Sequence, residues 1–159
     1  MFAFDFARAA TKPKTLREGQ TLPNRVVRGP LTYTADDLRG YCALVAHEDL
    51  TVMPLLWPQV KAAGLHLQLF TASDFPLSPL GMVHVSNHSE HFAVLKADQP
   101  LEAECDCTLQ GPGMGGLLLR LQTRAFAKGS TECVALYQAT ILVRAPRRAG
   151  EKRDGAKRE

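Results

Sequence analysis

The chain has 159 residues, of which 45% are hydrophobic and 22% are charged, as in ordinary globular proteins. This length indicates one domain with a moderate core. The sequence contains no apolar run near the roughly 20 residues that span a bilayer, and its first residues lack an apolar core of signal-peptide length. We therefore expect a cytoplasmic protein that does not enter a membrane.

The formal net charge of +3 comes from the end of the chain. Residues 147–159 hold six of the 19 basic residues and three of the 16 acidic ones, which leaves 13 of each upstream. We predict that this basic tail is disordered. Because the rest of the chain is neutral and its aromatic residues do not interleave with basic ones, we expect no nucleic-acid partner.

The four cysteines form no C-x-x-C pair, and two of them, Cys105 and Cys107, alternate with acidic residues as apolar strand positions do. We interpret these residues, with Cys42 and Cys133, as reduced thiols of a cytosolic protein. Neither a zinc site nor a disulfide framework is expected.

Residues 1–20 show little periodicity and are interpreted as an extended N-terminal arm, with a short strand following at 25–28. A first helix is predicted after Thr34, because Asp37 stands three residues later in a weaker form of the capping box. Apolar residues then recur at i, i+3, i+4 and i+7, as on one face of a helix: Leu38, Tyr41, Cys42 and Val45.

A second helix is predicted over residues 59–73, with Pro58 in its first turn. Only Lys61 and Gln68, with Gln59 beside them, interrupt its apolar surface. A helix that is apolar nearly all round is surrounded by other structure. On such a helix His66 is more often a core histidine with its hydrogen bonds satisfied than a catalyst.

The next segment, "DFPLSPLGMVHVSNHSEH" (residues 74–91), contains three histidines, and its prolines and glycine favour a loop followed by a strand. On a regular strand His84 and His88 share a face at a separation of about 13 Å, too far for one metal ion. We therefore expect no metal here. By the same alternation His84 and Asn87 face opposite sides, so only one of them is expected to face a pocket.

Three segments then alternate apolar and polar residues with a period of two, at 101–109, 117–124 and 133–143. The loop 111–116, "GPGMGG", matches G-x-G-x-x-G but joins two strands rather than a strand and a helix. We interpret it as a hairpin loop and expect no cofactor. Helices followed by consecutive antiparallel strands predict an α+β domain, residues 21–146, in which one curved sheet wraps one long helix.

These elements in this order resemble the hot-dog fold. The segments "TYTADDLRGYCALV", "WPQVKAAGLHLQLFTASDFPLSPLGMVHVSN" and "ATILVRAPRR" resemble, more specifically, the MaoC-like acyl dehydratases, which include the (R)-specific enoyl-CoA hydratases. The resemblance implies an acyl-CoA or acyl-carrier thioester as ligand and interconversion of 3-hydroxyacyl and enoyl thioesters. It also implies a homodimer, or a heterodimer with a catalytic hot-dog subunit.

Catalytic members of this family carry a G-D-x-N-P-[IL]-H segment after the first helix, whose Asp and His activate water. Here the chain reads "AHEDLTVMPLLWP", with Asp49 over the motif's Asp but apolar residues near Leu55 in the place of the His. Without that His the acid–base pair is incomplete. The resemblance is therefore closest to the non-catalytic N-terminal half of two-hot-dog members.

Three functions follow as hypotheses. In the first, the chain is a component of an acyl-thioester dehydratase or hydratase and lines the acyl pocket. In the second, it is an independently active hydratase or thioesterase, with Asp49 and His84 as candidate catalytic residues. In the third, it binds acyl ligands and catalyses no reaction. The residues that the resemblance and the turn geometry place at the pocket are His66, Phe75, Pro76, Leu80, Gly81, His84 and Asn87.

Overall fold

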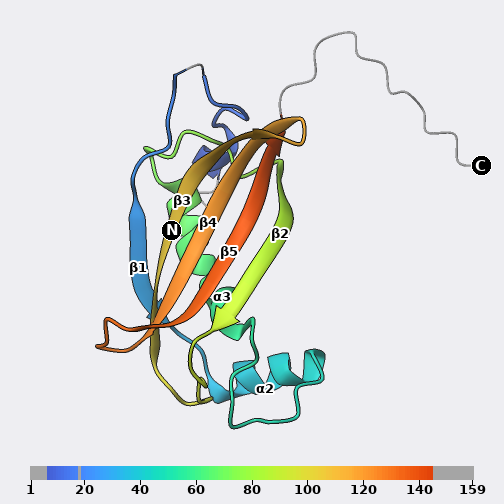
Figure 1. Ribbon diagram of the computed structural model, residues 1–159, viewed down its shortest axis with the longest axis vertical. Coiled ribbons are helices and arrows are strands. Elements are labelled where there is room, and N and C mark those ends of the chain that lie inside the picture. Colours follow the sequence, from blue (N-terminus) through green and yellow to red (C-terminus); the bar gives the residue numbers. More distant parts are fainter. Residues whose placement is uncertain (1–6, 18, 145–159) are drawn as a thin grey trace, which may run out of the picture.

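A computed structural model describes residues 7–17 and 19–144, so the predicted basic tail lies outside the described residues. Five antiparallel strands form one curved sheet, and helices lie against its concave face (Figure 1). The strand order is β1-β3-β4-β5-β2, which places β1 and β2 at the two edges. The strands are β1 (Val26–Leu31), β2 (Met82–His91), β3 (Leu101–Gly113), β4 (Gly116–Ala127) and β5 (Cys133–Arg144).

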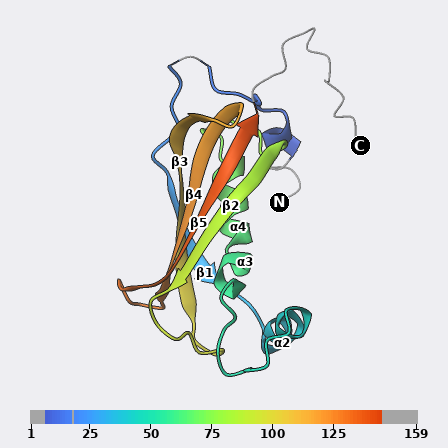
Figure 2. The same ribbon diagram turned by 45° about the vertical axis from the view of Figure 1, so that its right-hand side comes forward.

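The helix α2 (Ala35–Leu44) begins at the predicted position and lies beyond the end of the sheet (Figure 2). Thr34 Oγ1 accepts from the Asp37 backbone N–H at 3.1 Å, and Asp37 accepts from the Thr34 N–H at 2.9 Å. Both hydrogen bonds of a capping box are therefore present. Leu38 and Cys42 are its buried residues, as the apolar spacing predicts.

The predicted central helix consists of two segments that follow one another behind the sheet, α3 (Trp57–Lys61) and α4 (Ala63–Thr71) (Figure 2). Pro58 lies in the first turn of α3, as expected. The backbone tightens at Ala62, whose N–H is shared between the carbonyls of Pro58 and Val60. The regular helix is interrupted at this residue, where φ is −75° and ψ is −6°.

The N-terminal segment packs against the end of the central helix. Residues 7–10 are helical, and Lys12 Nζ donates to the carbonyls of Phe70 at 3.1 Å and Ala72 at 2.6 Å. A cation suits the carbonyl end of a helix. Nearby, Arg25 forms a bidentate ion pair with Asp74, with Nε donating to Oδ1 at 3.0 Å and Nη2 to Oδ2 at 2.8 Å. These contacts hold the chain where it leaves α4.

The concave face of the sheet is built from the alternating residues that the sequence predicted. Cys105 is 0% exposed and Cys107 4% exposed, which confirms both as inward-facing strand positions. Burial raises the pKa of the Cys105 thiol to about 11 and that of Cys107 to about 12. All four cysteines are unpaired. Cys105 and Cys107 are therefore protonated at neutral pH and poor nucleophiles.

The glycine-rich loop is the hairpin between β3 and β4, as predicted. Gly113 pairs with Gly116, and the two residues between them, Met114 and Gly115, have φ angles of 51° and 74°. Two consecutive positive φ angles are those of a type I′ turn. The loop does not present a helix N-terminus to a phosphate.

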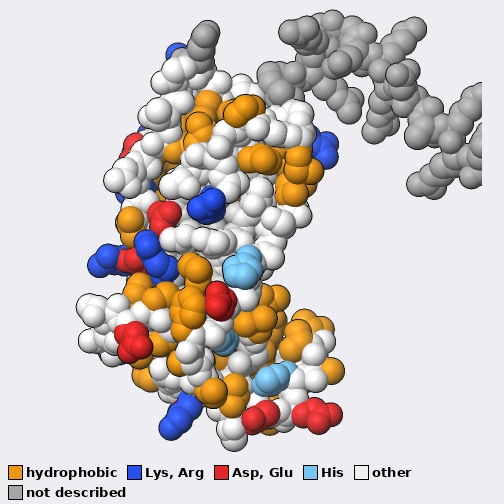
Figure 3. Space-filling view, in the orientation of Figure 1, with side chains coloured by type: hydrophobic (Ala, Val, Ile, Leu, Met, Phe, Trp, Pro, Cys, Tyr) orange, Lys and Arg blue, Asp and Glu red, His pale blue; other side chains and the backbone are white. Residues whose placement is uncertain are grey.

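The convex face carries acidic and basic side chains close together (Figure 3). Glu104 binds Arg28 at 2.6 Å and Arg124 at 2.9 Å, and Arg124 also binds Asp106 at 3.1 Å.

Among the described residues no helix is long and apolar enough to cross a membrane.

Candidate functional site

A β-bulge in β2 changes which of its side chains face the central helix. His84 pairs with Ile141 and Asn87 with Ala139, and the register shifts at Val85, between His84 and Ser86. Paired residues of antiparallel strands point to the same face of the sheet. Because Ile141 and Ala139 both face the core, His84 and Asn87 both face the helix side. The prediction that they face opposite sides is wrong, since one extra residue reverses the alternation.

The same bulge separates two of the histidines. His88 pairs with Gln138, on the convex face, whereas His84 lies on the concave one. The prediction that they share a face is therefore wrong for the same reason. His88 lies 3.7 Å from Glu90 on the outside of β2. No group of three or more potential metal ligands occurs among the residues that the structure describes.

Asn87 connects the edge strand to the central helix. Its Nδ2 donates to Gln59 Oε1 at 2.9 Å, and Gln59 Nε2 donates back to Asn87 Oδ1 at 3.3 Å. Asn87 Nδ2 also lies 3.3 Å from Ser89 Oγ, a second acceptor. Sequence reasoning missed Gln59 and Ser89, because the contact spans 28 residues and depends on the register of β2.

A row of polar side chains crosses the sheet beneath the helix. Cys105, Thr123, Tyr137 and Ser89 are successive cross-strand partners on β3, β4, β5 and β2. Thr123 and Tyr137 are each 1% exposed. The sequence signal was the polar group of Thr123 and of Tyr137, each at an inward position of an apolar alternation. Buried hydroxyls need hydrogen-bond partners, and two histidines supply them.

His66 on α4 is the first of these partners. Its Nε2 lies 2.8 Å from Thr123 Oγ1. Burial lowers the pKa of His66 to about 4. The ring is therefore neutral at physiological pH, half-buried and hydrogen bonded to a core residue, which supports the structural interpretation of this residue. Its assignment to the substrate pocket stays a prediction.

His91 at the end of β2 is the second partner, and sequence reasoning did not single it out. Its Nε2 lies 2.7 Å from the Tyr137 hydroxyl, with the two rings edge to face. Burial lowers the pKa of the imidazole, and a hydrogen bond with the Leu55 backbone opposes this shift. His91 thus joins β2, β5 and the segment before α3.

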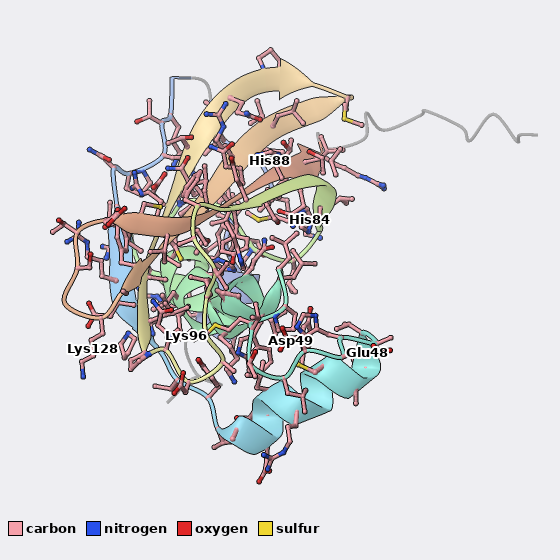
Figure 4. The ribbon with its side chains drawn as sticks, turned by 60° about the horizontal axis from the view of Figure 1, so that its bottom comes forward. Glu48, Asp49, His84, His88, Lys96 and Lys128 are labelled. Carbon is pink, nitrogen blue, oxygen red and sulfur yellow. The ribbon has the colours of Figure 1, made fainter. Side chains whose placement is uncertain are left out.

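Asp49 lies in the loop that follows α2, and its carboxylate is used locally. It accepts from the Thr51 hydroxyl at 2.6 Å and the Thr51 N–H at 2.9 Å, and these bonds lower its pKa. His84 lies on β2, apart from this loop (Figure 4), and its Nε2 contacts the Ser86 carbonyl at 3.0 Å. The two candidate catalytic residues are therefore not joined as an acid–base pair.

The remaining predicted pocket residues lie in two places. Phe75 is 1% exposed and packs edge to face on Phe70, so it belongs to the core beside half-buried Pro76. Leu80 and Gly81 line a cavity of about 380 Å³ at the start of β2. A larger cavity, about 550 Å³, lies beside α2 and contains none of the residues predicted from the sequence.

Three solved structures with similar folds are informative. HtdX from Mycobacterium tuberculosis is 21% identical with a TM-score of 0.65 over 74% of this chain and 50% of its own. The C-terminally truncated HadBC complex, a 3R-hydroxyacyl-ACP dehydratase from the same organism, is 16% identical with a TM-score of 0.63, covering 77% of this chain and 98% of its own. An (R)-hydratase from A. caviae involved in PHA biosynthesis is 13% identical with a TM-score of 0.52, covering 80% and 99%.

These likenesses show the fold. The chain has the hot-dog fold that the sequence predicted, with the central helix against a five-stranded antiparallel sheet, and the resemblance to MaoC-like hydratases is confirmed at that level. The chain spans about half the length of HtdX. No protein-family model and no curated protein matches the sequence.

Proposed function

We propose that this chain is a hot-dog component of an acyl-thioester hydratase or dehydratase, and that it contributes binding surface while a partner hot-dog domain contributes the catalytic pair. One observation carries the proposal: Asp49 is exposed and bonded to Thr51, and His84 lies on a different element. Hydration of an enoyl thioester needs a base and an acid positioned on one water molecule.

The neighbours in fold support the reaction class and the need for a partner. HadBC is a dehydratase complex, and HtdX is about twice as long as the region that this chain matches. In both proteins the part that this chain matches is accompanied by further polypeptide. The proposal includes a cytoplasmic location, which suits a chain with four unpaired thiols.

The free edge of the sheet supports β2 as the partner surface. β1 is the shorter edge and contains Pro30, which has no N–H to offer another strand. β2 has ten residues without a proline, and its middle residues are exposed. A second hot-dog domain that adds its own edge strand to β2 would satisfy these backbone groups.

The purified chain tests the proposal through its activity. We expect no hydration of crotonyl-CoA and no release of free CoA from acyl-CoA by the chain alone. Turnover that Asp49→Ala or His84→Ala abolishes, with folding retained by circular dichroism, would show an independent hydratase. Release of CoA that depends on either residue would identify a thioesterase instead.

A further inference from the structure

Two segments of the chain, residues 50–56 and 92–97, lie side by side at the end of the molecule that carries α2 (Figure 1). The Met53 N–H donates to the Leu95 carbonyl at 2.8 Å, and a second backbone hydrogen bond between the segments measures 2.9 Å. Met53 and Leu95 are themselves buried. The two segments therefore form a short two-stranded ribbon that is fixed to the core.

This ribbon exposes large apolar side chains from both of its segments. Single exposed apolar residues are ordinary on a protein surface. Several on two hydrogen-bonded segments form an apolar surface of the kind that marks an interaction site. We call this surface the apolar ribbon. Its side chains are 40% to 74% exposed: Leu50, Leu55, Leu56, Phe92 and Val94.

The apolar ribbon is separate from the outer edge of β2, which ends at His91. A strand added at β2 would bind the backbone N–H and C=O groups of that edge, whereas the apolar ribbon offers side chains. The pairing proposed for β2 therefore does not by itself explain why these apolar side chains are exposed.

Charged side chains of both signs flank the apolar ribbon. Glu48 and Asp49 precede its first segment and Lys96 lies on its second, and all three are exposed. Figure 4 shows Glu48 and Lys96 apart, with Asp49 between them. Together with exposed Asp98, these acids oppose the approach of a nucleic acid or an anionic membrane. A protein surface with apolar side chains and charges of both signs fits better.

A second copy of this chain has that composition. In a two-fold dimer the same surface patch faces itself, so each contact between two different residues occurs twice. A two-fold axis that crosses the ribbon between Glu48 and Lys96 places Lys96 of each copy against Glu48 of the other. The apolar side chains then form the core of the interface and the charges its rim.

We propose that the apolar ribbon is a self-association surface through which two copies of this chain form a two-fold dimer. The proposal goes beyond the function proposed above and does not depend on it, because the catalytic partner is assigned to β2. Burial of the apolar side chains drives the association, and Lys96 and Glu48 set its orientation.

Sedimentation equilibrium of the full chain over a range of concentrations measures the dimer. Phe92→Ser and Leu55→Ser each remove an exposed apolar side chain of the ribbon, and circular dichroism checks that both variants fold. Met114→Ser is the matched control, since Met114 is 67% exposed in the β3–β4 turn. We expect the wild type and Met114→Ser to dimerise equally, and each ribbon variant to weaken the dimer at least tenfold.

A charge swap tests the orientation of the two copies. Lys96→Glu should weaken the dimer several-fold because it faces Glu48 with a like charge, and Lys96→Glu combined with Glu48→Lys should restore the dimer. Lys128→Glu changes an exposed lysine that lies away from the ribbon (Figure 4) and should leave the dimer unchanged.

A wild type that stays monomeric at every concentration would overturn the proposal and leave the proposed function standing. If Phe92→Ser then weakens binding of a catalytic hot-dog protein, that partner is the occupant of the ribbon. A dimer that Val85→Lys dissociates, and that Phe92→Ser and Leu55→Ser leave intact, would show self-association at β2 and would also overturn the proposal. Failure of the double charge swap to restore the dimer would rule out the two-fold arrangement.

Discussion

The most informative single residue is His66, because its protonation state is coupled to folding. The pKa is about 4 in the folded chain and the ordinary value is 6.5, so the unfolded chain binds the proton more readily. Stability from this group is therefore present above pH 6.5 and is lost as the pH falls toward the folded value. Burial also lowers the pKa of His91, so His91 likewise destabilises the folded chain as the pH falls.

We expect His66 to reduce the free energy of unfolding by about 2 kcal/mol between about pH 7 and about pH 5. His66→Gln keeps a group that can hydrogen bond to Thr123 but does not titrate. Urea denaturation at the two pH values measures the free energy of unfolding. Between pH 7 and pH 5 this free energy should fall by about 2 kcal/mol less in the variant than in the wild type. An equal drop in both proteins would mean that the His66 ring is accessible to protons in the folded state.

At the scale of elements, the end of α2 carries a strained residue. Ala46 has a φ of 53°, and the His47 N–H donates to the Cys42 carbonyl at 2.9 Å, as in a Schellman motif. This position favours glycine, which adopts a positive φ without steric cost. We expect Ala46→Gly to stabilise the chain by about 0.5–1 kcal/mol.

Ala43→Gly, three residues earlier and inside the helix, is the control for that prediction. There glycine only adds backbone entropy to the unfolded state, so the variant should lose about 1 kcal/mol. Thermal or urea denaturation compares the two. Destabilisation of similar size in both variants would contradict the assignment of a left-handed cap at Ala46.

The elements themselves were largely predictable, since each depends on local patterns. The Thr34–Asp37 capping box, the Pro58 helix start and the alternation around Cys105 all indicate structure within a few residues of themselves. The bulge at Val85 was not predictable, because nothing in "HVSN" marks an extra residue, which appears only in the pairing with β5. The contacts at the candidate site were not predictable for the same reason, because the Gln59–Asn87 and His91–Tyr137 hydrogen bonds join segments that are distant in sequence.

For the molecule as a whole, the proposed assembly with a second hot-dog domain depends on the outer edge of β2. Within residues 7–17 and 19–144 no strand pairs with the outer edge of β2 along its ten residues, and Val85 at its bulge is 37% exposed. We expect Val85→Lys to weaken association with a second hot-dog domain at least tenfold, since a charge on an edge strand opposes addition of another strand. Sedimentation velocity measures the association.

Met114→Lys provides the matched control, because Met114 is 67% exposed in the β3–β4 turn, away from β2 in sequence and sheet order. It should assemble as the wild type does. If both lysine variants assemble normally, the partner surface lies elsewhere than at β2.

The most direct test of which subunit supplies the catalytic residues uses the assembled enzyme. The chain is co-purified with a hot-dog protein that carries an intact G-D-x-N-P-x-H segment, and the rate of enoyl-CoA hydration is measured for variants of each subunit. We predict that changing the His of the partner's motif to Ala abolishes hydration, while Asp49→Ala and His84→Ala in this chain leave the rate within about twofold. Loss of hydration in His84→Ala or Asp49→Ala, with the complex still assembled, would show that this chain supplies a catalytic residue.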